Sequence, residues 1–211
     1  NGSVTIKNNK ATANGDGTGI VSIDTKMKFN DSLTASGNAY IGINSNYQNT
    51  MIFNDSVTAS ENADTGINAE YSTMTFGGNV TASDNANIGI NANYNSIMKF
   101  NANNTNTNVV NASSNTLDGI IADNGSTMVF YVPVTANENT PPPEQQYANG
   151  IAALNQSEMT FHKDVTANGP DQPTGIYGSS SELTFHKNVT TNDNITQGIL
   201  AQNGTIMTFN G

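Results

Sequence analysis

Residues 51–76 read MIFNDSVTASENADTGINAEYSTMTF, and this stretch contains one complete copy of a unit that recurs along the chain. The unit begins with Met-x-Phe, passes through Val-Thr-Ala and reaches Gly-Ile before a second Met-x-Phe, ending at Phe76, starts the next copy. Self-similarity at a fixed period of this size indicates a repeat architecture rather than an ordinary globular fold.

Phenylalanine marks the period. The eight Phe residues are Phe29, Phe53, Phe76, Phe100, Phe130, Phe161, Phe185 and Phe209. They are separated by 24, 23, 24, 30, 31, 24 and 24 residues, and each follows a Met or Leu by two positions. In this alignment Ile6 takes the Phe position of a first copy. The repeat therefore predicts a single domain over residues 1–211, with insertions near 102–108 and 139–147.

Each unit contains three short stretches in which every second residue is apolar, the periodicity of β-strands rather than helices. Between them lie Asn, Gly, Asp and Ser, which tolerate tight turns. Three strands per 23–24 residues, stacked in parallel, predict an all-β, right-handed parallel β-helix of about eight rungs. We expect Met and Phe to fill the interior from one face, Val and Ala from the second, and Ile with a small residue from the third. Asn residues at the turns should stack into amide ladders.

Two insertions interrupt the period, and both fall between a Phe and the following Gly-Ile. Residues 102–108 are rich in Asn, whereas residues 139–147 contain Pro141, Pro142 and Pro143, which cannot join a strand ladder. Because the same interval lengthens in two neighbouring copies, we expect both loops to leave the same flank of the solenoid. They either mark a binding face or reflect drift at a tolerant turn.

The composition excludes several kinds of partner. The chain has a net charge of −10, a pI near 4.3, no Cys and no Trp, and the sequence contains no Arg. Binding to nucleic acid or to an anionic membrane surface requires clustered cations, so neither is expected. No apolar run reaches the roughly 20 residues that span a bilayer, so we expect no membrane insertion by this segment. Because the chain begins with Asn rather than Met, we expect a piece of a longer precursor.

The two ends of the chain resemble each other in sequence, as NGSVTI at residues 1–6 and NGTIMTF at residues 203–209. We expect them to occupy the same phase of the repeat, and neither carries a polar cap. The chain is then either a segment of a longer solenoid or a subunit that stacks head to tail. In the second case Val4, Ile6, Met207 and Phe209 would face the core of a neighbouring copy.

Three tyrosines follow the repeated Gly by five residues in successive copies: Tyr47, Tyr71 and Tyr94. They predict a column of rings at one corner of the solenoid. Such a column either packs the corner or forms an exposed aromatic platform, and aromatic surfaces beside Asn suit sugars.

Carboxylates also recur in register, as Asp31 with Asp55 and as Glu61 with Asp84. Paired carboxylates on adjacent rungs could act as general acid and base, as in polysaccharide-cleaving enzymes, or could bind calcium through their oxygens. A solvated outer face is the alternative that we favour.

His162 and His186 follow Phe in successive copies and precede Lys163 and Lys187. We expect the two imidazoles to stack on neighbouring rungs and to face water. A weak surface metal site with Glu158 and Glu182 is the alternative, but two ligands beside cations make a poor site, so we predict no metal site and no cofactor.

Three Phe residues begin the tetrapeptide Phe-x-x-Asn: Phe76-Gly-Gly-Asn79, Phe100-Asn-Ala-Asn103 and Phe185-His-Lys-Asn188. In this motif the repeats resemble the passenger domains of bacterial autotransporters, most closely those of the polymorphic outer-membrane type. The second family motif, Gly-Gly-Ala-aliphatic, survives here as Gly-Ile with a single Gly, for instance at Gly89-Ile90. The resemblance implies export across the outer membrane, a cell-surface or released location, and a role in adhesion or aggregation.

Together these features predict a non-enzymatic, extracellular β-solenoid at the bacterial cell surface. Its partner would be a glycan or protein on a host or neighbouring cell, reached through the Tyr column or the loop at Pro141–Pro143. A filament subunit that associates with itself through its ends is the main alternative, and an enzyme acting on polysaccharide is a remote one.

Overall fold

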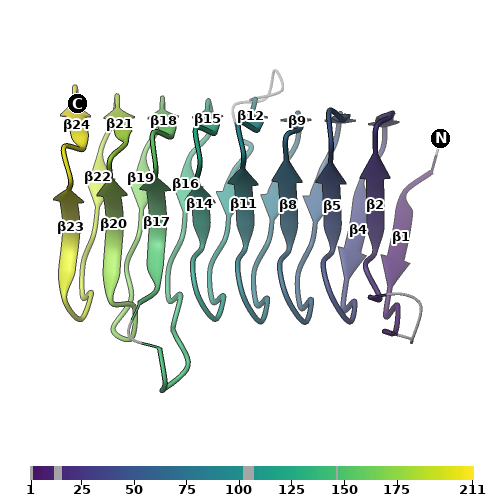
Figure 1. The fold of residues 1–211 in the computed structure, drawn as a ribbon, viewed down its shortest axis with the longest axis horizontal. Coiled ribbons are helices and arrows are strands. Elements are labelled where there is room, and N and C mark those ends of the chain that lie inside the picture. The colour runs from purple at the N-terminus through teal and green to yellow at the C-terminus, as the bar shows by residue number, and fades with distance from the viewer. Residues whose placement is uncertain (1, 12–15, 102–106, 146) are drawn as a thin grey trace.

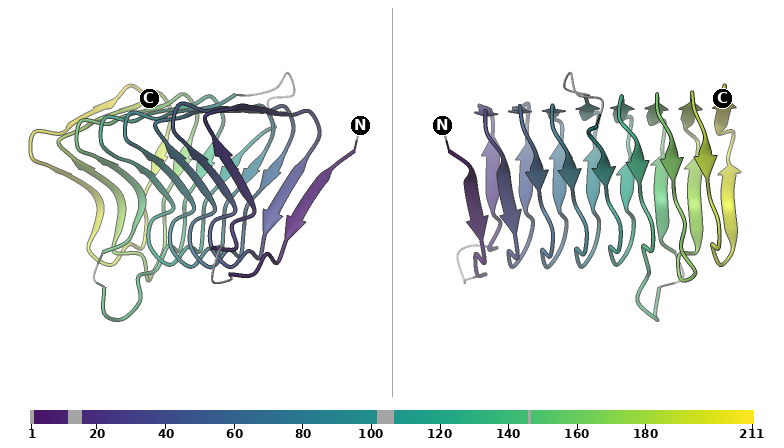
Figure 2. Two further views of the ribbon diagram at one scale, coloured as in Figure 1. Left: turned by 45° about the vertical axis from the view of Figure 1, so that its right-hand side comes forward. Right: turned by 180° about the vertical axis from the view of Figure 1, so that it is seen from behind.

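The computed structural model describes residues 2–11, 16–101, 107–145 and 147–211, which form a three-sided parallel β-helix (Figure 1). Three parallel sheets of eight strands each form its sides. The chain visits them in a fixed order, so that β1, β2 and β3 form the first rung and β22, β23 and β24 form the eighth. Figure 2 shows the rungs side by side along one axis, with the two termini at opposite ends. The predicted three-sided β-helix with about eight rungs is confirmed.

We name the sheets after their inward-facing residues. The Val sheet contains β1 (Val4–Lys7), β4 (Leu33–Ser36), β7 (Val57–Thr58), β10 (Val80–Thr81), β13 (Val110–Asn111), β16 (Val134–Thr135), β19 (Val165–Thr166) and β22 (Val189–Thr190). The Ile sheet contains β2 (Ile20–Ile23), β5 (Ile43–Asn46), β8 (Ile67–Glu70), β11 (Ile90–Asn93), β14 (Ile120–Ala122), β17 (Asn149–Leu154), β20 (Thr174–Ser179) and β23 (Gln197–Gln202). The Phe sheet contains β3 (Lys26–Phe29), β6 (Thr50–Phe53), β9 (Thr73–Phe76), β12 (Ile97–Phe100), β15 (Thr127–Phe130), β18 (Glu158–Phe161), β21 (Glu182–Phe185) and β24 (Ile206–Phe209).

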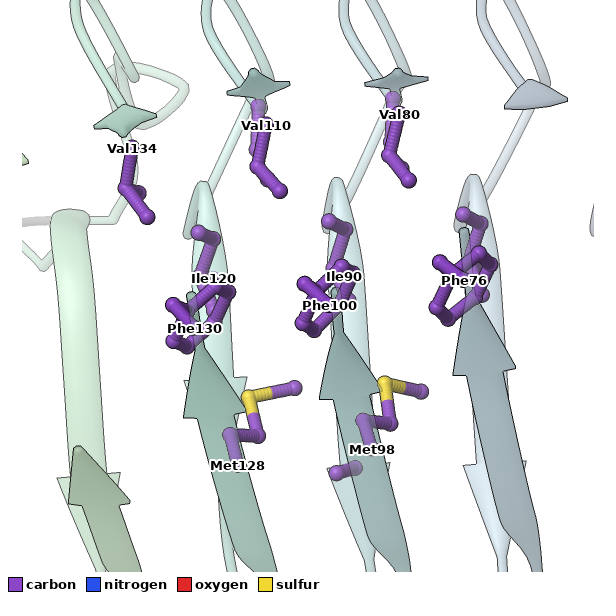
Figure 3. Packing of buried hydrophobic residues seen from close by; sticks show 14 of the residues in the cluster. Phe76, Val80, Ile90, Met98, Phe100, Val110, Ile120, Met128, Phe130 and Val134 are labelled. Carbon is purple, nitrogen blue, oxygen red and sulfur yellow. The ribbon is translucent and has the colours of Figure 1, made fainter. Parts of the chain in front are cut away.

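The core is a set of ladders that run along the axis. The eight Phe rings stack in one continuous column, with neighbouring ring centroids 4.6–5.3 Å apart and interplanar angles of 3–9°. Figure 3 shows Met98 and Phe100 directed into the interior together with Ile90 and Val110 from the other two sheets, and all four are buried. The three kinds of inward-facing pair expected from the sequence are therefore confirmed. Each stacked aromatic pair stabilises the fold by about 0.5–1.5 kcal/mol beyond the contribution of the apolar area that it buries.

The repeated Gly before each Ile is explained by the close approach of the rungs. A Cβ atom on Gly66 would lie 2.6 Å from the carbonyl oxygen of Ala59 and 2.7 Å from that of Gly89. Both distances are far below van der Waals contact, and both neighbours are backbone atoms of stacked strands and turns. The single Gly of the motif is therefore required by packing.

A second ladder consists of amides at the corner between the Val and Ile sheets, which we call the Val–Ile corner. Its members are Asn9, Asn38, Asn62, Asn85, Asn115, Asn139, Gln172 and Asn194. At Asn85 the side-chain oxygen accepts bonds from both the backbone N–H and the side-chain NH₂ of Asn62, at 3.0 and 3.1 Å. Asn85 in turn donates to Asn115 in the same way. The predicted amide ladder is confirmed, and it hydrogen-bonds polar groups that are buried at a turn.

The position assigned to Ile6 from the sequence is wrong. Strand β1 pairs with β4 in the Val sheet, so Ile6 lies opposite Ala35 rather than in the column of Phe. The two ends of the chain are consequently out of phase, because β1 belongs to the Val sheet and β24 to the Phe sheet. Val-Thr-Ile and Met-Thr-Phe share the same alternation of apolar residues, and alternation alone does not assign a strand to a sheet.

The prediction that both insertions leave one flank is also wrong. The first lies between β12 and β13, hence at the corner between the Phe and Val sheets, whereas the second lies between β16 and β17, at the Val–Ile corner. Residues 102–106, including Asn103, lie outside the described part of the chain. The interval from Phe to the next Gly-Ile contains two corners, separated by a two-residue strand. The length of this interval therefore does not show at which corner the additional residues lie.

The second insertion begins later than predicted. Asn139 is fully buried in the amide ladder, and the backbone N–H of Thr140 donates to Asn115, as in uninterrupted rungs. The additional residues are therefore 141–147.

Within the described residues, no helix is long and apolar enough to cross a membrane.

Candidate ligand-binding surface

Tyr47, Tyr71 and Tyr94 form a continuous column at the corner between the Ile and Phe sheets, the Ile–Phe corner. The ring centroids of Tyr47 and Tyr71 lie 6.4 Å apart, and those of Tyr71 and Tyr94 lie 5.1 Å apart, with interplanar angles of 12° and 10°. The three residues are 62%, 48% and 41% exposed. The structure therefore favours the exposed ridge over the corner-packing alternative, because much of each side chain contacts solvent.

The backbone at this corner does not require tyrosine. All eight rungs have a residue with positive φ, between 47° and 61°, five positions after the repeated Gly. The other five rungs fill the position with Asp24, Asn124, Asn155, Ser180 and Asn203. Asn and Asp adopt this left-handed conformation more readily than a bulky aromatic residue. Three consecutive rungs thus carry an exposed aromatic residue where the fold favours a small polar one.

The stacked rings of the Tyr column expose only part of their surface to a ligand. Since the rings stack, their faces largely contact each other, and the column presents mainly ring edges and hydroxyl groups. The free face of Tyr47 is beside a shallow hollow lined by Asp24, Gln48 and Tyr71. Tyrosine edges and hydroxyls suit a contact that combines apolar area with hydrogen bonds.

The proline loop lies elsewhere on the molecule. Pro141, Pro142 and Pro143 belong to the sixth rung at the Val–Ile corner, whereas the Tyr column occupies the second to fourth rungs at the Ile–Phe corner. Pro142 accepts a backbone hydrogen bond from Gln145, which closes a turn at the tip of the loop. The two binding features predicted from the sequence are therefore separate surfaces.

A second aromatic column was only partly anticipated. His162 and His186 stack 4.9 Å apart, as predicted, and Tyr131 extends the column with its ring 4.5 Å from that of His162. Burial lowers the pKa of His162, and the neighbouring His186 lowers it further. Tyr131 occupies the position after Phe130 that the two His residues occupy after theirs, so the common phase was the available signal.

The carboxylate pairs do not assemble into a site. Asp55 accepts a bond from the backbone of Ser56, and Glu61 and Asp84 are exposed along a shallow groove at the Val–Ile corner. The amide ladder forms the floor of this groove. Glu158 begins strand β18 whereas His162 follows its end, so the two lie at opposite ends of the strand. Among the residues that the structure describes, no group of three His, Cys, Asp or Glu side chains could hold a metal ion.

Asp118 is the carboxylate whose environment differs most from water. Burial raises its pKa to about 6, although hydrogen bonds from the side chain and backbone of Asn149 lower it. It lies directly before Gly119, and its bonds to Asn149 join the fifth and sixth rungs.

The residues proposed for end-to-end contact lie in the terminal rungs. Val4 and Phe209 are exposed, and Ile6 and Met207 are half-buried against the core. Because β1 belongs to the Val sheet, Val4 and Ile6 align with β22 along the axis, not with Met207 and Phe209.

No known protein-family model, no curated protein and no solved structure matches this chain.

Proposed function

We propose that this chain is a non-enzymatic, extracellular adhesive β-solenoid that acts through a lateral surface centred on the Tyr column. The observation that carries this proposal is the use of Tyr47, Tyr71 and Tyr94 at positions where other rungs have small polar residues. An exposed aromatic residue in a left-handed conformation costs folding free energy, so a surface contact is the physical reason to have three of them in a row.

The partner of the proposed adhesin is a glycan or protein on the surface of a host or neighbouring cell. Stacking on adjacent rungs limits the rotation of the three rings before binding. Preorganisation of this kind reduces the entropy lost on association. The net charge of −10 disfavours strongly anionic partners.

The sequence resemblance supports a bacterial cell-surface location. The Phe-x-x-Asn and Gly-Ile motifs resemble autotransporter passenger repeats, and passenger domains act outside the cell. In this proposal the stacked rungs are a rigid spacer and the corners carry the binding residues, the usual division of labour in solenoid proteins.

The direct test is the retention of protein-coated beads on an epithelial monolayer and on a layer of bacteria. The test variant changes Tyr47, Tyr71 and Tyr94 to Asn, the residue that fills this position in three other rungs, so its fold should be unaffected. The matched control is Tyr131→Asn, which removes an equally exposed tyrosine from the other aromatic column. We expect the number of retained beads to fall about ten-fold or more with the triple variant, and less than about two-fold with the control, relative to the unaltered chain. Equal retention by the triple variant and the unaltered chain would refute the proposal.

A second candidate function is a head-to-tail filament subunit, because the cores of both terminal rungs are open in this chain. Phe209 is 51% exposed, and each terminal rung contributes a strand to all three sheets. In a head-to-tail arrangement, a second copy stacks its β1 on β22 and its β3 on β24, which places Phe29 over Phe209. Open strand edges of this kind favour such pairing.

A further inference from the structure

A groove lies on the outer face of the Ile sheet in the last three rungs. There β17, β20 and β23 have six residues each, whereas the other strands of this sheet have three or four. Figure 1 shows these three strands side by side, with the proline loop extending past the end of β17. The strands of the Ile sheet are therefore longest in the three rungs that begin at the proline loop.

The apolar part of the groove combines two tyrosines with the aliphatic residues Leu154, Pro173 and Leu200. Tyr177 lies in the middle strand, in register with Ala152 on one side and Leu200 on the other. Tyr147, from the end of the proline loop, lines the groove and is 81% exposed, and Pro173 lines it as well. Neither tyrosine stacks on another aromatic ring in the described part of the chain, unlike those of the Tyr column. Tyr147 is largely exposed, whereas Tyr177 is half-buried and lines the groove.

The polar part of the groove has unused hydrogen-bonding groups. Among the described residues, the side chains of Thr174, Gln197 and Gln202 have no hydrogen-bond partner, although all three line the groove. Earlier rungs of the same sheet differ, because there Asn68 donates to Asn44 at 2.9 Å and the amides satisfy one another. Free amides and hydroxyls beside aromatic rings are the groups that orient a polar ligand.

No charged side chain is among the described residues that line the groove. A strongly charged ligand would therefore enter without a counter-charge, which is unfavourable. The groove instead combines ring faces with amides and hydroxyls. This combination matches a pyranose ring, whose C–H face packs on an aromatic ring while its hydroxyls bond to amides.

We infer that this groove is a binding site for a neutral pyranose sugar, with Tyr177 as the stacking residue and Thr174, Gln197 and Gln202 as hydrogen-bonding partners. The site is separate from the Tyr column in rung, corner and chemistry. It rests on the proposed adhesive function only for its biological setting, because sugar binding in the groove is measurable whether or not the Tyr column adheres to cells.

The test is an NMR titration of the whole chain with methyl glucoside, methyl galactoside, methyl mannoside, maltose, cellobiose and lactose. We expect at least one to bind with a Kd in the millimolar range and to shift amide signals of β17, β20 and β23. Tyr177→Ala should weaken that binding about ten-fold or more, whereas Tyr177→Phe, which keeps the ring, should weaken it less than about three-fold. The uronate that corresponds to the binding sugar should bind about ten-fold more weakly than the neutral sugar.

Two further variants keep the test decisive. Gln202→Ala changes an exposed side chain and should weaken binding several-fold even if Tyr177→Ala fails to fold. The Tyr column triple variant should bind the sugar as tightly as the unaltered chain, so failure of the adhesive proposal and failure of this one are distinguishable. Absence of binding by all six sugars, or unchanged binding in both Tyr177→Ala and Gln202→Ala, would overturn the inference.

Discussion

The repeated asparagines and tyrosines of this chain lie in opposite environments. Asn85 and its equivalents are buried and bond to the rungs on both sides, so they hold the corner together. Tyr71 and its neighbours lie at an equally regular corner but are about half exposed. Regular spacing alone therefore does not distinguish a buried structural ladder from an exposed column, whereas burial and hydrogen-bond partners do.

Replacing Asn85 with Ala should reduce the free energy of unfolding by about 2–4 kcal/mol, because it leaves the buried backbone N–H of Asn62 without an acceptor and removes two side-chain bonds. Chemical denaturation monitored by circular dichroism measures the change. The control is Asn188→Ala, which removes an exposed amide and should cost less than about 0.5 kcal/mol. Equal losses in the two variants would show that the ladder adds nothing to stability.

Asp118 should make stability depend on pH. Its folded pKa of about 6 lies above the ordinary 3.8, so ionisation is less favourable in the folded state than in the unfolded chain. This contribution to stability is fully present below about pH 4 and is lost as the pH rises through about 6. The Asn variant keeps an oxygen that accepts bonds from Asn149 and carries no charge.

Asp118→Asn should therefore stabilise the protein by about 1–3 kcal/mol at pH 8, and by progressively less toward pH 4. Thermal unfolding of both proteins across this range measures the difference. A difference that stays constant with pH, or a variant that is less stable at pH 8, would contradict the assignment.

At the scale of strands and corners, the sequence was sufficient for the repeating parts. Alternating apolar residues predicted the three strands per rung, and the inward-facing Phe, Val and Ile ladders followed from their spacing. It was insufficient at the places where the repeat is irregular. Ile6 fits two strand patterns equally well, and an insertion within an interval that covers two corners has no unique position.

The candidate binding residues show the same limit. The positions of Tyr47, Tyr71 and Tyr94 in one column followed from their spacing, but their exposure depended on which way a left-handed turn directs the side chain. The groove at Tyr177 was not predicted, because it arises where the insertion lies beside three lengthened strands. The groove does not repeat along the chain, so periodicity carried no signal for it.

Deleting residues 141–147 should leave the fold intact and weaken sugar binding in the groove. The deletion joins Thr140 to Ala148 and restores the spacing between ladder Asn and Gly found in the preceding rung. Melting temperature should change by only a few degrees, while the loss of Tyr147 should weaken the sugar affinity several-fold. Thermal melts and the sugar titration provide both readings.

The matched comparison is deletion of residues 139–147, which also removes the buried ladder residue Asn139. This variant should be about 2–4 kcal/mol less stable than the shorter deletion. If the shorter deletion were equally damaging, the assignment of the loop boundary would be wrong.

At the scale of the whole molecule, the chain is a rod with a different surface at each corner. The Tyr column occupies early rungs of the Ile–Phe corner, the column of Tyr131, His162 and His186 occupies later rungs of the next corner, and the proline loop leaves the third. Each rung is held mainly by its neighbours, so one corner can change without rearranging the others. A solenoid of this kind is well suited to carry several independent lateral contacts.

We propose that the lateral surface, rather than the ends, performs the function. The most direct measurement is bead retention by three proteins at equal coating density: the unaltered chain, the variant with Asn at positions 47, 71 and 94, and Phe209→Lys, which introduces a charge into the open core of the last rung. We predict that the variant with Asn at positions 47, 71 and 94 retains about ten-fold fewer beads or less. Phe209→Lys should retain as many beads as the unaltered chain. Loss of retention by Phe209→Lys with full retention by the column variant would contradict the account and favour the head-to-tail filament.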